Sequence, residues 1–281
     1  MSDACEQALR DHLATVRDIV RLKYSEDGQA RPEDDVVDIC VSFDGTWHKR
    51  GHTSHTGIGV AIDILTGYVV DFEVVLNFCL VCEREKNMED DRTLSSLKDF
   101  MAKHKEVCTI NHSGSSNAME VAAAKKIWER STNGPLHYVT MLSDGDSKAY
   151  DAVTNMKPYG KKLVKKEECV NHVAKRLGAA LETLKKKSQG SGVPLGGRGM
   201  LTATMIKTLQ TYYQNAIKNN AGNTIAMKQA IMATPYHVTS SDDDPDHRYC
   251  PEKSWCWYKN PERPKTSPDL PKQMLEKLLP V

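Results

Sequence analysis

The stretch VTMLSDGDSKAYDAV, residues 139–153, sets the architecture expected of this chain. Apolar residues run up to Ser143, then Asp144, Gly145 and Asp146 arrive together, and a helical pattern follows. A strand that leads through a polar turn into a helix is typical of an α/β sheet. Because a buried strand seldom ends on carboxylates without cause, the question is what these carboxylates hold.

A second stretch, DICVSFDGTWHKRG at residues 38–51, ends an apolar run on Asp44 in the same way. If the first strand ends at Phe43, and if it is the parallel neighbour of the strand before Asp144, the two aspartates emerge together at the carboxyl edge of the sheet. Adjacent carboxylates repel each other unless a cation such as Mg²⁺ or Mn²⁺ neutralises them. From the residues alone, Asp44 and Asp144 could equally well belong to turns. For Asp146, a helix-capping role is favoured.

The remaining pattern predicts the order of helices and strands. Expected helices cover residues 3–24, 93–104, 117–130, a stretch from about 147, a long basic stretch after 169, and residues 200–220 and 224–234. Expected strands cover residues 36–43, 57–65, 67–76, 138–143 and 163–169, with a hairpin turn at Thr66 and Gly67. The last fifty residues contain eight prolines and are expected to be irregular. This order predicts the α/β class, with a mixed sheet flanked by helices.

Three parts are expected along the chain. Residues 1–35 form a leading helix and linker, and residues 36–188 form the sheet domain with an insertion at about 77–113. Residues 189–281 form a helical region with a Pro-rich tail that contains Cys and His. A Gly-rich segment at residues 190–199 separates the last two parts.

Composition narrows the class of protein. Of 281 residues, 40% are apolar and 27% are charged, as in an ordinary globular protein. No run of eighteen apolar residues and no signal peptide is present, so we expect no membrane span and a reducing, intracellular compartment. In such a compartment eight cysteines indicate metal ligands or buried thiols more than disulfides.

The insertion carries a set of cysteines and a histidine at metal-ligand spacing. Cys79 and Cys82 form C-x-x-C, and Cys108 and His112 form C-x-x-x-H after a charged stretch that can loop out. Four such ligands predict a closed, tetrahedral Zn²⁺ site of structural type. A redox C-x-x-C is the alternative, and it lacks the usual strand-turn-helix setting.

A second, looser group lies in the Pro-rich tail and consists of His237, His247, Cys250 and Cys256. An irregular, aromatic-rich chain is hard to order without a cross-link, and a second Zn²⁺ site would supply one. The alternative is that these four side chains are unpaired surface residues. Cys169 and His172 form C-x-x-H at the start of the basic helix. They either complete the second site in place of two tail ligands or pack without a metal.

Positive charge is concentrated between residues 157 and 187, where ten Lys or Arg face three Glu although the whole chain has a net charge of +1. Such a patch can bind phosphates. The alternative is that these residues form the solvated face of a helix. The candidate phosphate-contacting residues are Lys161, Lys162, Lys165, Lys166, Lys175 and Arg176. Lys49 and Arg50, in the loop after Asp44, are further candidates.

Five motifs in this order resemble the Mutator-like transposase domain found in many animal genomes. They are DICVSFDGTWHKRGHTSHTG, NFCLVCE, VCTINHSGSSNAME, MLSDGDSKAYDAV and EECVNHVAKRL, and the resemblance covers nearly the whole chain from about Asp38. Such transposases are similar to the ribonuclease H-like superfamily, whose catalytic core holds two metal ions with Asp, Asp and Glu. The resemblance makes Asp44 the first acid and Asp144 the second.

The resemblance implies a nuclear enzyme that cuts and joins DNA at transposon ends. A homodimer is compatible with it. The third acid would be expected after a helical insertion, in a segment that reads roughly Asn-Glu-Ser. No such segment precedes Val281, so the expectation is a chain that stops short and is truncated or inactive. The competing expectation is a noncatalytic, zinc-stabilised module, derived from a transposase, that binds DNA or protein.

Overall fold

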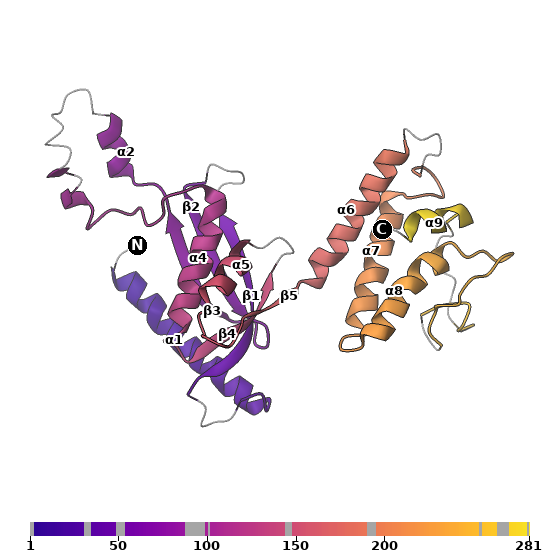
Figure 1. Cartoon of the computed structure of the whole chain (residues 1–281), viewed down its shortest axis with the longest axis horizontal. Helices are drawn as coiled ribbons and strands as arrows, with labels where there is room; N and C mark the ends of the chain where they lie inside the picture. The colour runs from indigo at the N-terminus through magenta and orange to yellow at the C-terminus, as the bar shows by residue number, and fades with distance from the viewer. Residues whose placement is uncertain are drawn as a thin grey trace. The chain divides into compact units, whose positions relative to one another are not determined.

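The structure is a computed structural model (Figure 1). It describes residues 3–30, 35–48, 54–87, 99–100, 102–143, 148–189, 195–252, 255–262, 270–279 and 281. The chain divides into two compact units, Met1–Glu168 and Cys169–Val281. The predicted site residues Asp144, Lys49 and Arg50 lie outside the described residues.

The first unit is built around one five-stranded mixed sheet. Its elements are α1 (Asp3–Glu26), β1 (Val37–Trp47), β2 (Thr56–Asp63), β3 (Val69–Leu76), α2 (Leu80–Asn87), α4 (Ser116–Ser131), β4 (Leu136–Ser143), α5 (Lys148–Met156) and β5 (Lys165–Glu168). The strand order is β3-β2-β1-β4-β5. β1, β4 and β5 run parallel, and β2 is antiparallel to both β1 and β3. The predicted mixed sheet flanked by helices is therefore confirmed.

The hairpin between β2 and β3 turns where the sequence predicts it. Gly67 has φ of 74°, a conformation that costs glycine nothing and strains other residues. The buried Asp63 carboxylate accepts the Thr66 backbone N–H at 2.8 Å and the Thr66 hydroxyl at 2.6 Å. It also accepts the Tyr24 hydroxyl at 2.8 Å, which joins α1 to the hairpin.

The main core lies between the sheet and α4, which packs on β2 and β3 and also contacts β1 and β4. Trp128 of α4 is fully buried and meets Phe43 and Tyr138 edge-on, with ring centroids 5.6 and 5.7 Å away. Its indole N–H donates to the Tyr138 carbonyl at 3.0 Å, so the one polar group of this large ring is satisfied.

Close approach of α4 to β2 depends on Gly59. A Cβ at this position would come within 2.5 Å of the Ala123 Cβ, closer than two carbon atoms can lie. Gly59→Ala is therefore expected to destabilise the first unit by about 1–3 kcal/mol through overpacking. Gly57→Ala on the same face is the control, because its Cβ would lie 3.3 Å from Met119 and needs only a small shift. Urea unfolding measures both, and equal stability of the two variants would contradict the expected clash.

β3 is an edge strand whose outward carbonyls are covered by side chains, and we refer to this as the covered edge. Arg17 of α1 donates to the Val70 carbonyl and Arg130 of α4 to the Phe72 carbonyl, each at 2.9 Å. The Asn111 side chain donates to the Val74 carbonyl at 2.8 Å and accepts the Leu76 N–H at 2.8 Å. The backbone N–H groups of Asn111 and His112 donate to the Leu76 carbonyl at 3.0 Å.

A buried carboxylate lies beside the covered edge. Asp71 is 1% exposed and binds two arginines: Arg17 at 3.2 Å, and Arg130 through two nitrogens at 2.8 and 3.2 Å. Glu73 extends the network, because it pairs with Arg130 and Lys126 at 2.9 Å each. The network ties α1, β3 and α4 together at one corner of the unit.

β1 is longer than predicted. The sequence suggested an end at Phe43, whereas the strand continues to Trp47. The reason is the antiparallel ladder with β2, which pairs Asp44 with Val60 and Trp47 with Gly57. Asp44 thus lies inside a strand rather than directly after one.

The second unit is helical. It contains α6 (Val170–Ser188), α7 (Ala203–Lys218), α8 (Thr224–Val238), the 3₁₀ turn η2 (Lys272–Met274) and α9 (Leu275–Leu278). Its core joins these elements through buried apolar residues: Leu181, Leu195, Leu201, Met205, Ile206, Leu209, Val238, Leu270, Met274 and Leu278. The sequence predicts that the helix after residue 169 belongs to the sheet domain, with a boundary at 188. In the structure this helix, α6, packs on α7, and the two units divide after Glu168.

α8 also departs from the prediction, because it continues through Pro235 to Val238. This extra turn is what carries His237 into the interior of the unit. Among the described helices of both units, none is long and apolar enough to cross a membrane.

Candidate metal centres and the carboxylate edge

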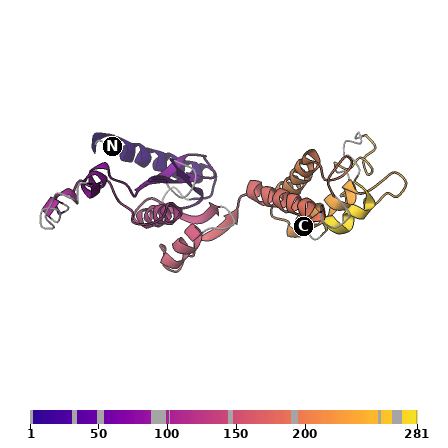
Figure 2. The same cartoon turned by 90° about the horizontal axis from the view of Figure 1, so that it is seen from above.

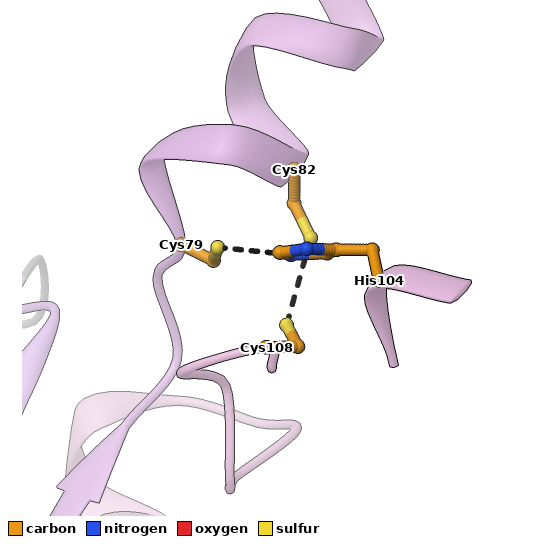
Figure 3. Close-up of side chains that lie close together, drawn as sticks. All are labelled: Cys79, Cys82, His104 and Cys108. Carbon is orange, nitrogen blue, oxygen red and sulfur yellow. Dashed lines mark hydrogen bonds between the residues drawn. The ribbon is translucent and has the colours of Figure 1, made fainter. Parts of the chain in front are cut away.

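The insertion in the first unit brings four metal-ligating side chains together, and we call them the first cluster: Cys79, Cys82, His104 and Cys108. Figure 3 shows the four side chains pointing toward one another from different segments. Cys79 precedes α2 and Cys82 lies in its first turn, whereas His104 and Cys108 come from the return of the insertion. All four candidate ligand atoms lie within 4.8 Å of one another.

The spacing of these atoms fits one tetrahedral ion. The Cys82 and Cys108 sulfurs are 3.6 Å apart, and the Cys79 sulfur is 3.3 Å from the His104 Nε2. Around a tetrahedral Zn²⁺ two sulfurs would be about 3.8 Å apart, and a sulfur and a nitrogen about 3.6 Å. The first cluster therefore has the donor set and the size of a Cys₃His zinc site.

The histidine of the first cluster is His104 and not the predicted His112. His112 is held elsewhere, because its backbone N–H donates to the Leu76 carbonyl at the end of β3. Its Nε2 is buried without a hydrogen-bond partner among the described residues. His104 lies four residues before Cys108, so the spacing H-x-x-x-C was as informative as the C-x-x-x-H that suggested His112.

The second unit holds a second cluster, formed by the predicted set His237, His247, Cys250 and Cys256. All four are buried, with exposed fractions of 4% or less. The two Nδ1 atoms are 3.2 Å apart, and the Cys250 sulfur is 3.7 Å from each of them. A tetrahedral Zn²⁺ would place two nitrogens about 3.3 Å apart and a nitrogen and a sulfur about 3.6 Å apart.

Neighbouring groups orient the ligands of the second cluster. His247 turns its Nδ1 toward the cluster, and its Nε2 lies 2.9 Å from the Ser240 hydroxyl. That hydroxyl accepts the Asp246 backbone N–H at 2.9 Å, which fixes its position. Tyr258 stacks on the His247 ring at 4.4 Å, and Trp255 meets the His237 ring edge-on at 4.5 Å. Such partners hold metal-binding histidines in one orientation and tautomer.

Cys79 and Cys82 of the first cluster and Cys250 of the second have displaced pKa values. Hydrogen bonding from the Cys82 backbone N–H lowers the pKa of Cys79 to about 5. Burial raises the pKa of Cys82 to about 11, and burial also raises the pKa of Cys250 well above its usual value. A bound metal ion displaces the protons of such thiols, so affinity for metal falls as the pH is lowered.

Cys169 and His172, the other predicted ligands, lie at the start of α6 and belong to neither cluster in the described chain. Cys169 is half-buried and is the N-cap residue of α6. Of the two arrangements that the sequence left open, the structure brings together the four tail residues without this pair.

Asp44 lies toward the carboxyl end of β1, the strand that pairs in parallel with β4. This pairing runs from Val37 opposite Leu136 to Ser42 opposite Leu142. The Asp44 side chain is exposed and accepts the Gly45 N–H at 2.8 Å. Among the described residues it forms no ion pair, so its carboxylate faces solvent at this edge.

The predicted basic residues are divided between the two units. Lys161, Lys162, Lys165 and Lys166 lie in or just before β5, and Lys175 and Arg176 are exposed on α6. Lys162 pairs with Asp38 at 2.7 Å, and Lys166 lies 3.7 Å from Glu168. Lys161 and Lys165 are exposed next to the sheet.

Comparison with known proteins adds one finding on the family. The family model described as Mutator-like transposase matches residues 1–256. A search of curated proteins and a search of solved structures each find no match.

Proposed function

The chain belongs to the Mutator-like transposase family, and from this premise we propose that the first unit is the catalytic core of a metal-dependent DNA transposase. In this proposal the mixed sheet is of the ribonuclease H-like type. Asp44 and Asp144 are the first two acids, and they hold Mg²⁺ or Mn²⁺. The reaction is cleavage of phosphodiesters at transposon ends in the nucleus, followed by strand transfer.

The pairing of β1 with β4 is the observation that carries this proposal. The two strands are parallel neighbours, and the last described pair is Ser42 opposite Leu142. Asp44 and Asp144 each follow two residues later. A register continued by these two residues would put both carboxylates at one edge of the sheet, where ligands collect in α/β proteins. Aspartate oxygens are the ligands that hard divalent ions prefer.

The proposed chemistry needs little more from the protein than position and charge. A pair of divalent ions between two acids activates the attacking oxygen and stabilises the leaving oxygen of a phosphodiester. Asp44 suits this role because it is exposed and lies on a strand of the sheet.

DNA contact is assigned to the basic residues. Lys161 and Lys165 lie next to the sheet, and Lys175 and Arg176 are exposed on α6, so both units offer positive charge to a phosphate backbone. Lys49 and Arg50 follow β1 in sequence and complete the proposed set, together with Lys162 and Lys166. Contacts of this kind give affinity without sequence specificity.

The second cluster supports the assignment of Zn²⁺ as a structural cofactor. Its ligands are fully enclosed, two are histidines with fixed orientation, and the position of an exchangeable water is taken by a fourth protein ligand. Closed sites of this type stabilise folds and do not catalyse.

The decisive test of the catalytic proposal is Asp44→Asn. The substitution keeps the size of the side chain and removes its charge, so Mn²⁺ bound at the edge is expected to be lost, with at least about 100-fold weaker Mg²⁺-dependent nicking of plasmid DNA. Electron paramagnetic resonance of Mn²⁺ with the full chain measures the binding. Asp38→Asn is the matched control, because Asp38 is exposed on the same strand but pairs with Lys162. Equal Mn²⁺ binding by both variants would rule out Asp44 as a ligand.

A second candidate is a noncatalytic, zinc-stabilised module that binds DNA or protein. It is favoured by the second cluster, whose four enclosed protein ligands are of structural rather than catalytic type. The same assay separates the candidates: zinc content and DNA binding without Mn²⁺ at Asp44 and without nicking support this one.

A further inference from the structure

We propose that the insertion of the first unit is a zinc-dependent module, folded around one ion held by Cys79, Cys82, His104 and Cys108. Its described parts are residues 77–87, 99–100 and 102–112. The inference rests on the geometry and burial of the first cluster and is independent of the proposed transposase activity.

The burial pattern is the main evidence. Among the described residues from 77 to 115, the buried ones are Cys79, Cys82 and His104, and Cys108 is half-buried. None of these described residues belongs to the hydrophobic clusters of the protein. The ligands themselves are therefore the interior of the module.

Among its described residues, the apolar side chains of the insertion do not build an alternative core, and Phe100 packs on the ligand His104 itself, with ring centroids 5.5 Å apart. Leu80, Val81 and Val107 are 54%, 42% and 73% exposed, although each is next to a ligand in sequence. The insertion extends away from the sheet in both views of the first unit (Figures 1 and 2), so the sheet does not supply a core either. The three side chains buried among the described residues cannot offset the conformational entropy that these residues lose on folding.

A metal ion supplies the missing stabilisation. Structural Zn²⁺ contributes about 10–16 kcal/mol of apparent binding free energy in small zinc domains, which is then folding free energy. The first cluster has the ligand types, the count and the interatomic distances for it. The thiolates and the imidazole would then join Cys79 and α2 to the returning chain through one ion.

The base of the insertion is held differently. Asn111 bonds to Val74 and Leu76 through its side chain, and the Thr109 hydroxyl donates to the Phe78 carbonyl at 3.1 Å. These bonds involve no cluster residue, so the base is expected to stay attached to β3 when the metal is removed. Metal loss should therefore unfold residues 79–85 and 102–108 and leave the sheet intact.

The choice of histidine gives the sharpest test. The full chain is expected to contain two equivalents of Zn²⁺, one in each cluster, as measured by mass spectrometry of the metal. His104→Ala should contain one equivalent, and His112→Ala should keep two. His112 is the matched control because it lies in the same segment, has the same spacing from Cys108 and is bonded to β3.

Hydrogen exchange and a rescue variant complete the experiment. In His104→Ala the amides of residues 79–85 and 102–108 should lose protection, while those of β1 and β4 keep theirs. His104→Cys should restore the second equivalent and the protection, because a fourth thiolate also completes a tetrahedral site. Two equivalents in His104→Ala, one in His112→Ala, or unchanged protection after metal loss would each overturn the proposal.

Discussion

Cys250→Ala is expected to release the metal ion of the second cluster and to unfold the described chain between Val238 and Leu270. Three remaining ligands cannot close a tetrahedral site, and a structural zinc site contributes about 10–16 kcal/mol to the fold that it holds. Among the described residues, the hydrophobic cluster at this site consists of Ala233 and two of the ligands, Cys250 and Cys256. The aromatic rings that pack here, Trp255, Trp257 and Tyr258, do so on the ligand histidines, so their packing depends on the site as well. α6 and α7 share the separate core around Leu181 and Leu209, so their helical structure should persist.

The measurement is zinc content together with hydrogen exchange over residues 239–262. Cys169→Ala is the matched control, since Cys169 was the alternative ligand in the sequence and lies outside both clusters. It should keep the full metal content and the protection. Loss of one zinc equivalent in Cys169→Ala, or full content in Cys250→Ala, would show that the second site uses other ligands.

Asp71→Ala should cost the first unit about 3–5 kcal/mol of unfolding free energy. The substitution leaves the guanidinium groups of Arg17 and Arg130 facing each other without the buried charge that binds both. Arg130 is 41% exposed and still pairs with Glu73, so water and Glu73 recover part of the loss and the lower end of the range is expected.

The comparison for Asp71 is Asp38→Ala. Asp38 and Lys162 form an ion pair of similar length, but both side chains are about half exposed, and surface pairs contribute about 1 kcal/mol or less. Urea unfolding of the two variants should therefore differ by at least about 2 kcal/mol. Equal stabilities would mean that Asp71 is not the electrostatic anchor of α1 and α4.

Much of the fold could be predicted from periodicity and turn residues. The hairpin at Thr66 and Gly67, the helix expected over 117–130 and the strand before Asp144 depend on local patterns, and each occurs in the structure. The end of β1 could not be predicted in this way. The strand extends past Asp44 because β2 continues the ladder, and pairing between distant segments is not visible in local composition.

The candidate sites show the same division. The four ligands of the second cluster could be predicted from residue type, since residues 189–281 contain no other histidine or cysteine. In the first cluster two histidines have equal spacing from Cys108, and only the folded structure, with His104 beside Cys79 and His112 bonded to Leu76, decides between them. The unit boundary was misplaced for a related reason: contacts of α6 with α7 are long-range, and its basic sequence gives no sign of them.

The covered edge of β3 bears on how copies of this protein can associate. Edge strands of two molecules can pair through their free backbone groups, and the two sheets then form one continuous sheet or an aggregate. Here Arg17, Arg130 and Asn111 occupy those acceptors on β3, so an incoming strand would have to displace charged groups that Asp71 and Glu73 hold in place. Self-association by sheet extension is thus blocked on this side, and a dimer of the protein would have to form through some other surface.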